Sequence, residues 1–265
     1  MSEFYVRFIS SIILIPLVLI ILWVGSYWFL GLITLITVIA GYEWSRLCNI
    51  TYPLSKFLLL LLGPFIIIAF VIGGFSVGII VFILFLIISV LTIDKNIINK
   101  VWTFMGLFYL GLPALSIVVL RSDSHFGLQG VLFLFVMVWL TDVGGYVFGR
   151  FLGGPKLAPL ISPGKTWAGS FGAVILPVGF AYVVFLNINY ELPIDIVLCA
   201  IIISISSQFG DLFESCIKRV FNKKNSGNLI PGHGGLLDRI DGLLMASTVM
   251  IVILISKTGT LLLWP

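Results

Sequence analysis

The sequence predicts an all-α polytopic membrane protein with about nine transmembrane helices, and both its composition and its charge distribution favour this class. Hydrophobic residues make up 60% of the 265 residues and charged residues only 10%, whereas an ordinary soluble domain carries about 25% charged residues. A soluble core of this size cannot bury so much apolar surface. The composition therefore excludes a soluble globular domain, a disordered chain and a secreted disulfide scaffold.

Apolar segments recur at the length that a membrane span requires, which is about 20 residues for roughly 30 Å of hydrocarbon. The first apolar run, from Phe8 to Tyr42, is too long for one helix, and Gly25-Ser26 is the natural place to divide it. Strands are not expected, because the sequence does not alternate and an open sheet edge cannot lie in lipid. The predicted spans cover residues 8–24, 27–46, 56–72, 76–93, 101–120, 128–148, 168–187, 195–217 and 237–256.

We group these spans into three segments along the chain. Residues 1–72 hold helices 1–3 and residues 73–126 hold helices 4 and 5, which are nearly featureless runs of apolar side chains. Residues 127–265 hold helices 6–9, and polar residues concentrate there. This C-terminal segment is therefore the predicted catalytic part.

The placement of Lys and Arg supports the count of nine, since cytoplasmic loops are enriched in these residues. With nine spans, the N-terminus and the loops after helices 2, 4, 6 and 8 carry all 15 Lys and Arg residues except Arg121 and Lys257. An error of one helix would scatter these charges. We therefore expect a multi-pass protein of the cell (inner or plasma) membrane, with a cytoplasmic N-terminus. The net charge of +4 is too small to indicate a nucleic-acid partner.

Acidic residues in or beside membrane helices are costly to bury and are functional candidates by default. On the predicted helix 195–217, Asp211 shares one face with Glu214, Ser215 and Lys218, because these residues follow helical spacing. The acidic candidates between residues 141 and 241 are Asp142, Asp211, Glu214, Asp238 and Asp241.

Asp211 and Asp238 are predicted to face one cavity. Asp211 lies about 10 Å deeper than Lys218 at 1.5 Å per residue, and Asp238 would reach a similar depth on the next helix of an antiparallel hairpin. Two such carboxylates repel unless a cation lies between them, and oxygen ligands of this kind suit Mg²⁺. The alternative is a structural salt-bridge cluster of Asp211, Lys218, Asp238 and Arg239. Residue types alone leave both the metal site and this cluster open.

The loop between these helices combines glycines with basic side chains. Backbone N–H groups at glycines can approach an anion closely, and basic groups neutralise it. This combination indicates a site for phosphates bridged by a cation, although anionic lipid headgroups would attract the same bases. His233 is either an acid or base or a residue that holds the turn. The glycines are Gly227, Gly232, Gly234 and Gly235, and the bases are Lys218, Arg219, Lys223, Lys224 and Arg239.

The sequence Gly164-Lys165-Thr166 invites comparison with a nucleotide-binding P-loop. That motif requires a glycine where Pro159 stands, and no strand is predicted before it. We therefore exclude a P-loop ATPase and keep Lys165 and Thr166 as candidate phosphate contacts.

Four spaced motifs between residues 141 and 242 resemble the signature of phosphatidate cytidylyltransferases, the CDP-diacylglycerol synthases. Their order and spacing make the pattern very specific. The chain before residue 141 is similar only in hydropathy, with an Arg7-initiated span and Glu43-Trp44-x-Arg46 after helix 2. The motifs are Thr141-Asp142-x-Gly-x-Tyr-x-x-Gly-Arg150, Ser162-Pro163-x-Lys165-Thr166-Trp167, Gln208-x-Gly210-Asp211-Leu212-x-Glu214-Ser215, and the run from Ser215-x-Ile217-Lys218-Arg219 through Lys224, Gly227 and Ile230-Pro231-x-His233-Gly234-Gly235-Leu236-x-Asp238-Arg239-Ile240-Asp241.

The resemblance implies transfer of CMP from CTP to the phosphate of phosphatidic acid, which gives CDP-diacylglycerol and pyrophosphate. It further implies a polytopic homodimer in the lipid bilayer, with a Mg²⁺-dependent active site and a second cation such as K⁺. Attack by one phosphate on another needs positioning and charge neutralisation. A phosphate monoester is itself nucleophilic, so a general base is not required.

On these grounds we assign three sets of candidate site residues. The catalytic set is Asp142, Asp211, Lys218, Arg219, Asp238 and Asp241. The substrate-binding set is Ser162, Lys165, Thr166, Ser215, Lys224, His233, Gly234, Gly235 and Arg239. The metal-ligand set is Asp211, Glu214 and Asp238.

The chain departs from the family signature at two positions. Asn225 stands where the signature has Asp after Lys, and Ala168 stands where it usually has Glu after Lys-Thr-Trp. Two carboxylates that are expected near the phosphate site are therefore neutral. Neither belongs to the deepest pair, Asp211 and Asp238, so the predicted activity stands.

Two other functions would also place polar groups in a membrane. An ion-coupled transporter needs buried carboxylates, but transporters usually show inverted repeats, and the polar chemistry here is confined to the C-terminal part. A CDP-alcohol phosphatidyltransferase is another lipid phosphotransferase, but its D-G-x-x-A-R motif is missing, because Asp241-Gly242 is followed by Leu-Leu-Met-Ala246.

Overall fold

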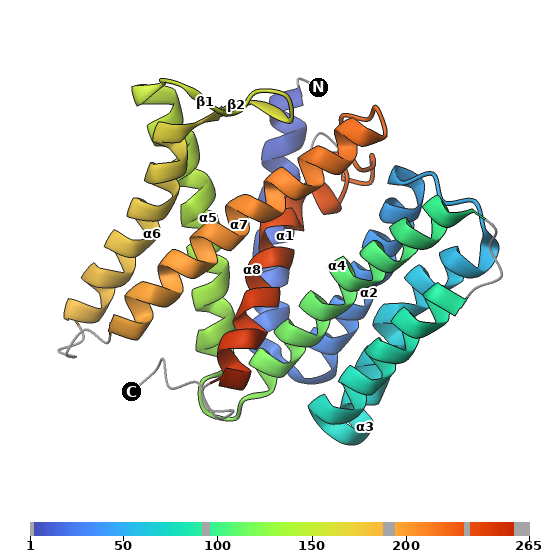
Figure 1. Ribbon diagram of the computed structural model, residues 1–265. Helices are drawn as coiled ribbons and strands as arrows, with labels where there is room; N and C mark the ends of the chain where they lie inside the picture. Colours follow the sequence, from blue (N-terminus) through green and yellow to red (C-terminus); the bar gives the residue numbers. More distant parts are fainter. Residues whose placement is uncertain (1–2, 92–95, 188–193, 231–233, 257–265) are drawn as a thin grey trace. The chain divides into compact units, whose positions relative to one another are not determined.

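The computed structural model describes residues 3–91, 96–187, 194–230 and 234–256, which form eight helices and one short β-hairpin (Figure 1). The predicted all-α membrane class is confirmed, since helices α2 to α7 are long and apolar enough to cross a membrane. Nine crossings and a cytoplasmic N-terminus stay predictions. The elements are α1 (Glu3–Val24), α2 (Ser26–Leu47), α3 (Pro53–Leu91), α4 (Ile97–Ser122), α5 (Gly127–Leu152), β1 (Lys156–Ala158), β2 (Ser162–Thr166), α6 (Trp167–Asn187), α7 (Ile194–Val220) and α8 (Leu237–Ser256).

The internal contacts divide the chain into two compact units. Unit 1 consists of Met1–Ser122 and Val220–Ile240, and unit 2 consists of Asp123–Arg219 and Asp241–Pro265. Helix α8 therefore begins in unit 1 and continues in unit 2. The division of the chain into the segments 1–72, 73–126 and 127–265 is based on the order of the spans, and it stays a prediction.

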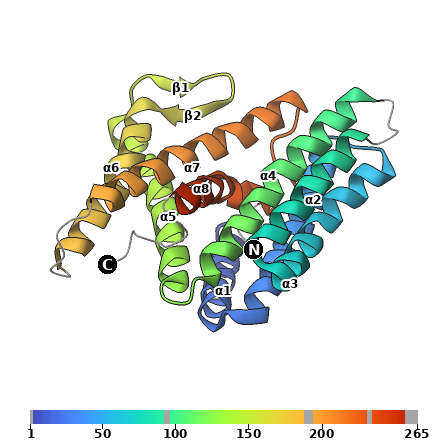
Figure 2. The same ribbon diagram turned by 60° about the horizontal axis from the view of Figure 1, so that its bottom comes forward.

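Unit 1 is built on α2, α3 and α4, which lie side by side (Figure 2). The fully buried Trp44 side chain joins α2 to α4, because its indole N–H donates a hydrogen bond of 2.8 Å to the carbonyl oxygen of Trp102. Its ring also lies 5.3 Å from that of Tyr109. A side chain at Gly106 would overlap the indole, so the close approach of these helices requires glycine there.

Helix α3 reverses direction at Gly73 and Gly74. Both residues have non-helical backbone angles, and Gly74 has a φ of 65°, a conformation that favours glycine. The rings of Phe65 and Phe85 lie 5.8 Å apart, whereas a straight helix would separate these residues by about 30 Å. The predicted break in this apolar stretch is therefore confirmed at Gly73-Gly74, and two separate membrane spans on either side of it stay a prediction.

Unit 2 is built on α5 and α6, which lie side by side in Figure 1. Their backbones approach closely, because a side chain at Gly144 of α5 would overlap the backbone of Gly172 in α6. Helix α7 is joined to α5 by a 3.0 Å hydrogen bond from the hydroxyl of Thr141 to that of Ser204. These contacts bring the polar segments of three helices together.

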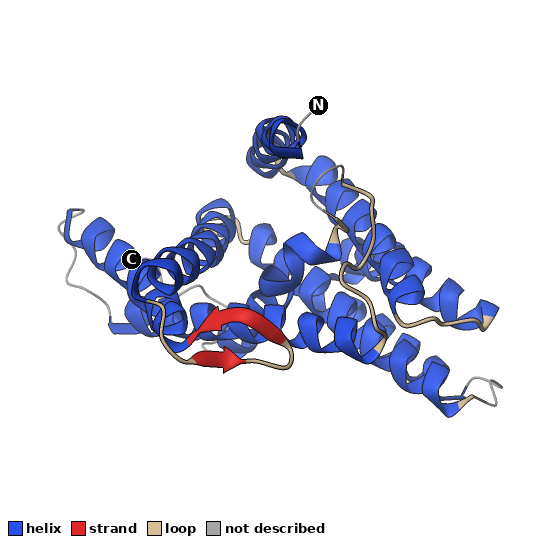
Figure 3. Ribbon diagram, turned by 90° about the horizontal axis from the view of Figure 1, so that it is seen from above, coloured by secondary structure: helices blue, strands red, loops and turns tan. Residues whose placement is uncertain are grey.

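A short antiparallel hairpin connects α5 to α6 and is drawn in red in Figure 3. Lys156 of β1 pairs with Thr166 of β2, and Ala158 pairs with Ser162. The expectation that the chain forms no strands is wrong for this loop, because the rule against open edges applies only within hydrocarbon. Lys165 lies within β2 itself and not in a loop after a strand, so the exclusion of a P-loop holds.

Candidate active site

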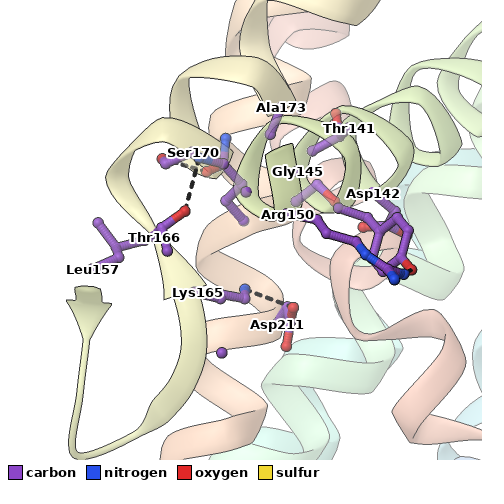
Figure 4. Close-up of a pocket in the computed structure, with 16 residues that line it drawn as sticks. Thr141, Asp142, Gly145, Arg150, Leu157, Lys165, Thr166, Ser170, Ala173 and Asp211 are labelled. Carbon is purple, nitrogen blue, oxygen red and sulfur yellow. Dashed lines mark hydrogen bonds and ion pairs between the residues drawn. The ribbon is translucent and has the colours of Figure 1, made fainter. Parts of the chain in front are cut away.

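A cavity of about 540 Å³ opens in unit 2 between α5, β2, α6 and α7 (Figure 4). Glycines form part of its wall and leave room beside the backbone. Its polar lining comes from four elements, so the fold gathers residues that are far apart in the sequence. The polar side chains are Thr141, Asp142, Tyr146, Arg150, Lys165, Thr166, Ser170, Ser207, Gln208 and Asp211.

Lys165 and Asp211 point toward each other across this cavity (Figure 4). The Lys165 ammonium lies 2.6 Å from Oδ2 of Asp211, and the side chains are 25% and 39% exposed. An ion pair with this exposure is partly solvated, so its net contribution to stability is small. The pair therefore places one cation and one anion where a polar ligand can reach both.

The predicted polar face of α7 is present in the structure. The Ser215 hydroxyl donates a hydrogen bond of 3.3 Å to Oδ1 of Asp211. One turn further along, the Lys218 ammonium lies 3.2 Å from Oε2 of Glu214, whose side chain is fully buried. These four residues follow one stripe of the helix, as their spacing predicts.

Asp241 joins this stripe from α8. A side chain at Gly210 of α7 would overlap the backbone of Asp241, so the two helices touch at this point. The Asp241 side chain is hydrogen-bonded to Glu214 and lies close enough to Asp211 for their charges to interact. Within unit 2, the acidic partner of Asp211 is therefore Asp241.

The other predicted site residues near the hairpin each have a different environment. The Thr166 hydroxyl accepts a 3.1 Å hydrogen bond from the backbone N–H of Gly169, so it caps the start of α6. Ser162 is half-buried in β2, and Asp142 is exposed at the cavity wall. Arg219 donates a hydrogen bond of 3.2 Å to the carbonyl oxygen of Ile161, which ties the end of α7 to the hairpin loop.

Asp238 belongs to unit 1 and holds the loop that precedes α8. Its Oδ2 accepts hydrogen bonds from the backbone N–H of Ser226 at 2.9 Å, the Ser226 hydroxyl at 3.0 Å and the backbone N–H of Gly235 at 2.9 Å. The N–H of Gly235, a predicted phosphate donor, is thus engaged by Asp238. A metal-binding role for Asp238 stays a prediction.

Glu43 also belongs to this loop site, although it is not among the candidate site residues predicted from the sequence. Its side chain is 4% exposed, and its carboxylate accepts hydrogen bonds from the backbone N–H groups of Leu236 at 3.0 Å and Leu237 at 2.9 Å. The signal in the sequence was an acidic residue at the end of an apolar helix. Its partners lie 193 and 194 residues further along the chain, so sequence spacing could not reveal them.

The other residues of the predicted phosphate loop are distributed as follows. Lys224 and Arg239 are exposed, and Gly234 has a φ of 88°. Lys223 caps the end of α2, because its ammonium donates hydrogen bonds to the carbonyl oxygen of Leu47 at 3.1 Å and to Oδ1 of Asn49 at 2.8 Å. His233 lies outside the described residues.

The donor set suits a hard cation, since the clustered groups are carboxylate oxygens. Within the described parts of the chain, no three His, Cys, Asp or Glu side chains are grouped closely enough to hold a metal by themselves. Mg²⁺ usually takes one or two protein carboxylates and completes its coordination with water and substrate phosphates. Asp211 with Asp241 matches that requirement.

Comparisons with known proteins point to one family. The chain matches the cytidylyltransferase family over residues 5–256. It is 37% identical over 267 aligned residues to the phosphatidate cytidylyltransferase of Brucella suis biovar 1 (strain 1330), with 94% of this chain and 93% of the relative covered. It is 39% identical over 178 residues to the protein of the same name from Staphylococcus haemolyticus (strain JCSC1435), with 64% and 66% covered.

Proposed function

The chain belongs to the cytidylyltransferase family, and from this we infer that it transfers CMP from CTP to phosphatidic acid, giving CDP-diacylglycerol and pyrophosphate in phospholipid biosynthesis. The structural observation that supports this function is the Lys165–Asp211 pair in a polar cavity between apolar helices. A lipid phosphate and a nucleotide phosphate are both anionic and need cations at one place. The names of the relatives favour this enzyme over the ion-coupled transporter and over other lipid phosphotransferases.

The reaction forms one phosphorus–oxygen bond and breaks another. A phosphate oxygen of phosphatidic acid attacks the α-phosphorus of CTP, and the bond to the β-phosphate oxygen breaks to release pyrophosphate. We propose that Lys165 binds phosphate oxygens of the nucleotide, because its ammonium faces the cavity. Lys218 lies further along the same face of α7 and would neutralise charge near the helix end.

We propose Mg²⁺ as the cofactor, with Asp211 and Asp241 as its protein ligands in unit 2. The ion, when bound, would neutralise charge on the phosphates. The closeness of the Asp211 and Asp241 carboxylates supports this assignment, because two negative charges repel each other unless a cation lies nearby. Glu214 and Asp238 remain further candidate ligands. A second cation such as K⁺ and a homodimer are proposals that rest on the resemblance to the family.

We propose that the catalytic loops face the cytoplasm, where CTP is available. Two contacts in unit 1 support the alternation of spans. Arg121 in the last turn of α4 donates a 3.1 Å hydrogen bond to the carbonyl oxygen of Leu22 near the end of α1. Asn99 at the start of α4 donates one of 3.3 Å to the hydroxyl of Thr51 after α2. Helix ends that the nine-span topology assigns to one side thus contact each other or the adjoining loop.

Cysteine labelling tests this sidedness. Ser226 lies in the relevant loop but is 6% exposed, so the exposed Asn228 is the better position for a cysteine. Cys199 is buried, and burial raises the pKa of the Cys48 thiol to about 12, so Cys48 stays protonated at neutral pH and should not react. In a Cys216→Ser background, Asn228→Cys should react with an impermeant maleimide only when the cytoplasmic face is exposed. Labelling in intact cells would overturn the topology.

An assay of the purified protein with CTP, phosphatidic acid and Mg²⁺ tests the function itself. We expect pyrophosphate release that requires all three components, together with formation of CDP-diacylglycerol. Reconstituted vesicles provide the contrasting measurement, since uptake of an ion or solute without nucleotide turnover would support a transporter. Absence of nucleotide transfer under these conditions would refute the proposed function.

A further inference from the structure

Glu43 at the end of α2 is buried against the loop that precedes α8. Its side chain is 4% exposed, although a carboxylate is costly to remove from water unless hydrogen bonds compensate it. The bonds come from the backbone N–H groups of Leu236 and Leu237 and from the Ser226 hydroxyl, at 3.0, 2.9 and 3.3 Å. The carboxylate is therefore specifically bound by this loop.

The two backbone donors lie at the start of α8, which begins at Leu237. The first N–H groups of a helix have no carbonyl partner within the helix, and a negative charge is favourable at this end of the helix dipole. Glu43 supplies both an acceptor and a charge from a different helix. It thus fixes the point at which α8 begins.

Glu43 and Asp238 both hold this loop and share one contact, the Ser226 hydroxyl. The Ser226 hydroxyl lies 3.3 Å from Oε2 of Glu43 and 3.0 Å from Oδ2 of Asp238, and its single hydrogen serves one of them at a time. The loop passes so close to Glu43 that a Cβ at Gly235 would lie 2.7 Å from Oε2, and one at Gly227 would lie 2.5 Å from Oε1. At Gly227 the carboxylate of Glu43 therefore requires glycine, whereas at Gly235 a Cβ would meet the Ser226 hydroxyl and the backbone nitrogen of Gly227 as well as Glu43.

We propose that Glu43 is a positioning residue for the transfer reaction, and this proposal rests on the proposed function. It acts through the described loop residues 224–230 and 234–236 and through Asp238, and holds them in the conformation that receives the nucleotide phosphates. It does not touch substrate itself. A role of this kind differs from general stabilisation of unit 1, because its loss should affect one substrate more than the other.

Hydrogen exchange in the unmodified protein gives the first test. Amides in the first turn of a helix usually exchange readily, because they have no partner within the helix. The structure instead predicts slow exchange for the amides of Leu236 and Leu237. Exchange as fast as that of the exposed Lys224 and Asn225 would overturn the proposal whatever the variants do.

The substitution Glu43→Gln gives the second test, since it keeps the shape and replaces one acceptor oxygen by a donor. A lost hydrogen bond to a charged group should make exchange at Leu236 and Leu237 roughly tenfold to a hundredfold faster. We expect the KM for CTP to rise by about the same factor, with the KM for phosphatidic acid changed less than about twofold.

Ser45→Ala is the matched control. Ser45 is 5% exposed, lies two residues from Glu43, and donates its 2.8 Å hydrogen bond to Tyr42 of its own helix. Exchange and both KM values should stay at the unmodified level in this variant. Equal loss in Ser45→Ala and Glu43→Gln, or unchanged kinetics in Glu43→Gln, would overturn the positioning role. An inactive unmodified protein would instead refute the proposed function, while its exchange pattern would still test the contact.

Discussion

Two carboxylate clusters in this chain are held by different kinds of donor. In unit 1, Glu43 and Asp238 accept hydrogen bonds from backbone N–H groups of one loop, and we call them the backbone-bound cluster. In unit 2, Asp211 and Glu214 are paired with lysine ammonium groups, and we call them the lysine-paired cluster. Both clusters consist of carboxylates on or beside apolar helices, so the difference lies in their partners.

The difference in partners has a chemical consequence. A backbone N–H cannot leave its acceptor unless the turn that carries it changes shape, so the backbone-bound cluster fixes a conformation. A lysine ammonium lies at the end of a flexible side chain, so it can exchange a carboxylate for a phosphate when substrate arrives. We therefore expect the lysine-paired cluster to take part in the chemistry and the backbone-bound cluster to maintain the loop, with Asp238 as the one member of that cluster that is also a candidate metal ligand.

The largest effect is expected from Asp211→Asn. Removing the charge should lower turnover by about a thousandfold, the upper range for loss of one electrostatic contact at a reacting phosphate. Folding and membrane insertion should be intact, because the amide keeps the shape. Pyrophosphate release measures turnover, and Asp195→Asn at the other end of α7 is the control. Full activity of Asp211→Asn at low Mg²⁺ would refute the assignment of Asp211 as a metal ligand.

Changes at Asp238 should separate turnover from loop structure. Asp238→Asn keeps a carbonyl oxygen that can accept the bonds from Ser226 and Gly235, so we expect the fold to be retained. The variant loses the negative charge of a candidate metal ligand, so we expect turnover to be nearly lost. Asp238→Ala removes the acceptor as well and should also lower stability, by about 1–3 kcal/mol. Thermal unfolding in detergent compares the two variants. Equal stability in both would show that Asp238 does not hold the loop.

Lys165→Ala should lower kcat/KM by roughly a hundredfold, because a phosphate would lose a charge-assisted contact worth about 1.5–3 kcal/mol. Lys156→Ala provides a matched control, since Lys156 is an exposed lysine in the same hairpin. Initial rates over a range of CTP concentrations measure the effect. If the two variants behave alike, the cavity between α5, β2, α6 and α7 does not bind the nucleotide.

The smallest effect is expected at the two departures from the family pattern. A Cβ on Gly234 would lie 3.6 Å from the side-chain amide carbon of Asn225 and 2.9 Å from Oδ2 of Asp238. Asn225→Asp would add a carboxylate beside the backbone-bound cluster, and we expect it to lower the Mg²⁺ concentration for half-maximal activity by a few-fold, since Mg²⁺ prefers carboxylates. Ala168→Glu should act likewise in unit 2.

Mg²⁺ titration of initial rate in both single variants and in the double variant tests this pair. Effects that do not add would indicate a shared ion. An unchanged midpoint in each variant would leave Asn225 as a residue that shapes the turn, a role for which asparagine is well suited.

Much of the fold could be predicted because its causes are local. Composition determined the membrane class, and the Gly73-Gly74 pair marked the reversal inside α3. Helical spacing alone predicted that Asp211, Ser215 and their neighbours share a face of α7, and the structure confirms this. The reversal and the shared helical face each depend on residues within a few turns of one another, where periodicity and backbone preference decide the outcome.

The contacts that complete the site depend on packing between distant segments. The pairing of Lys165 with Asp211 follows from the placement of β2 beside α7, and the hairpin itself was not expected. Glu43 meets Leu237, which lies 194 residues further along the chain. The sequence by itself determined the class, the helical faces and the family signature. Only the tertiary structure decided which donor each carboxylate binds, because hydrogen-bond partners far apart in sequence are selected by how the helices pack.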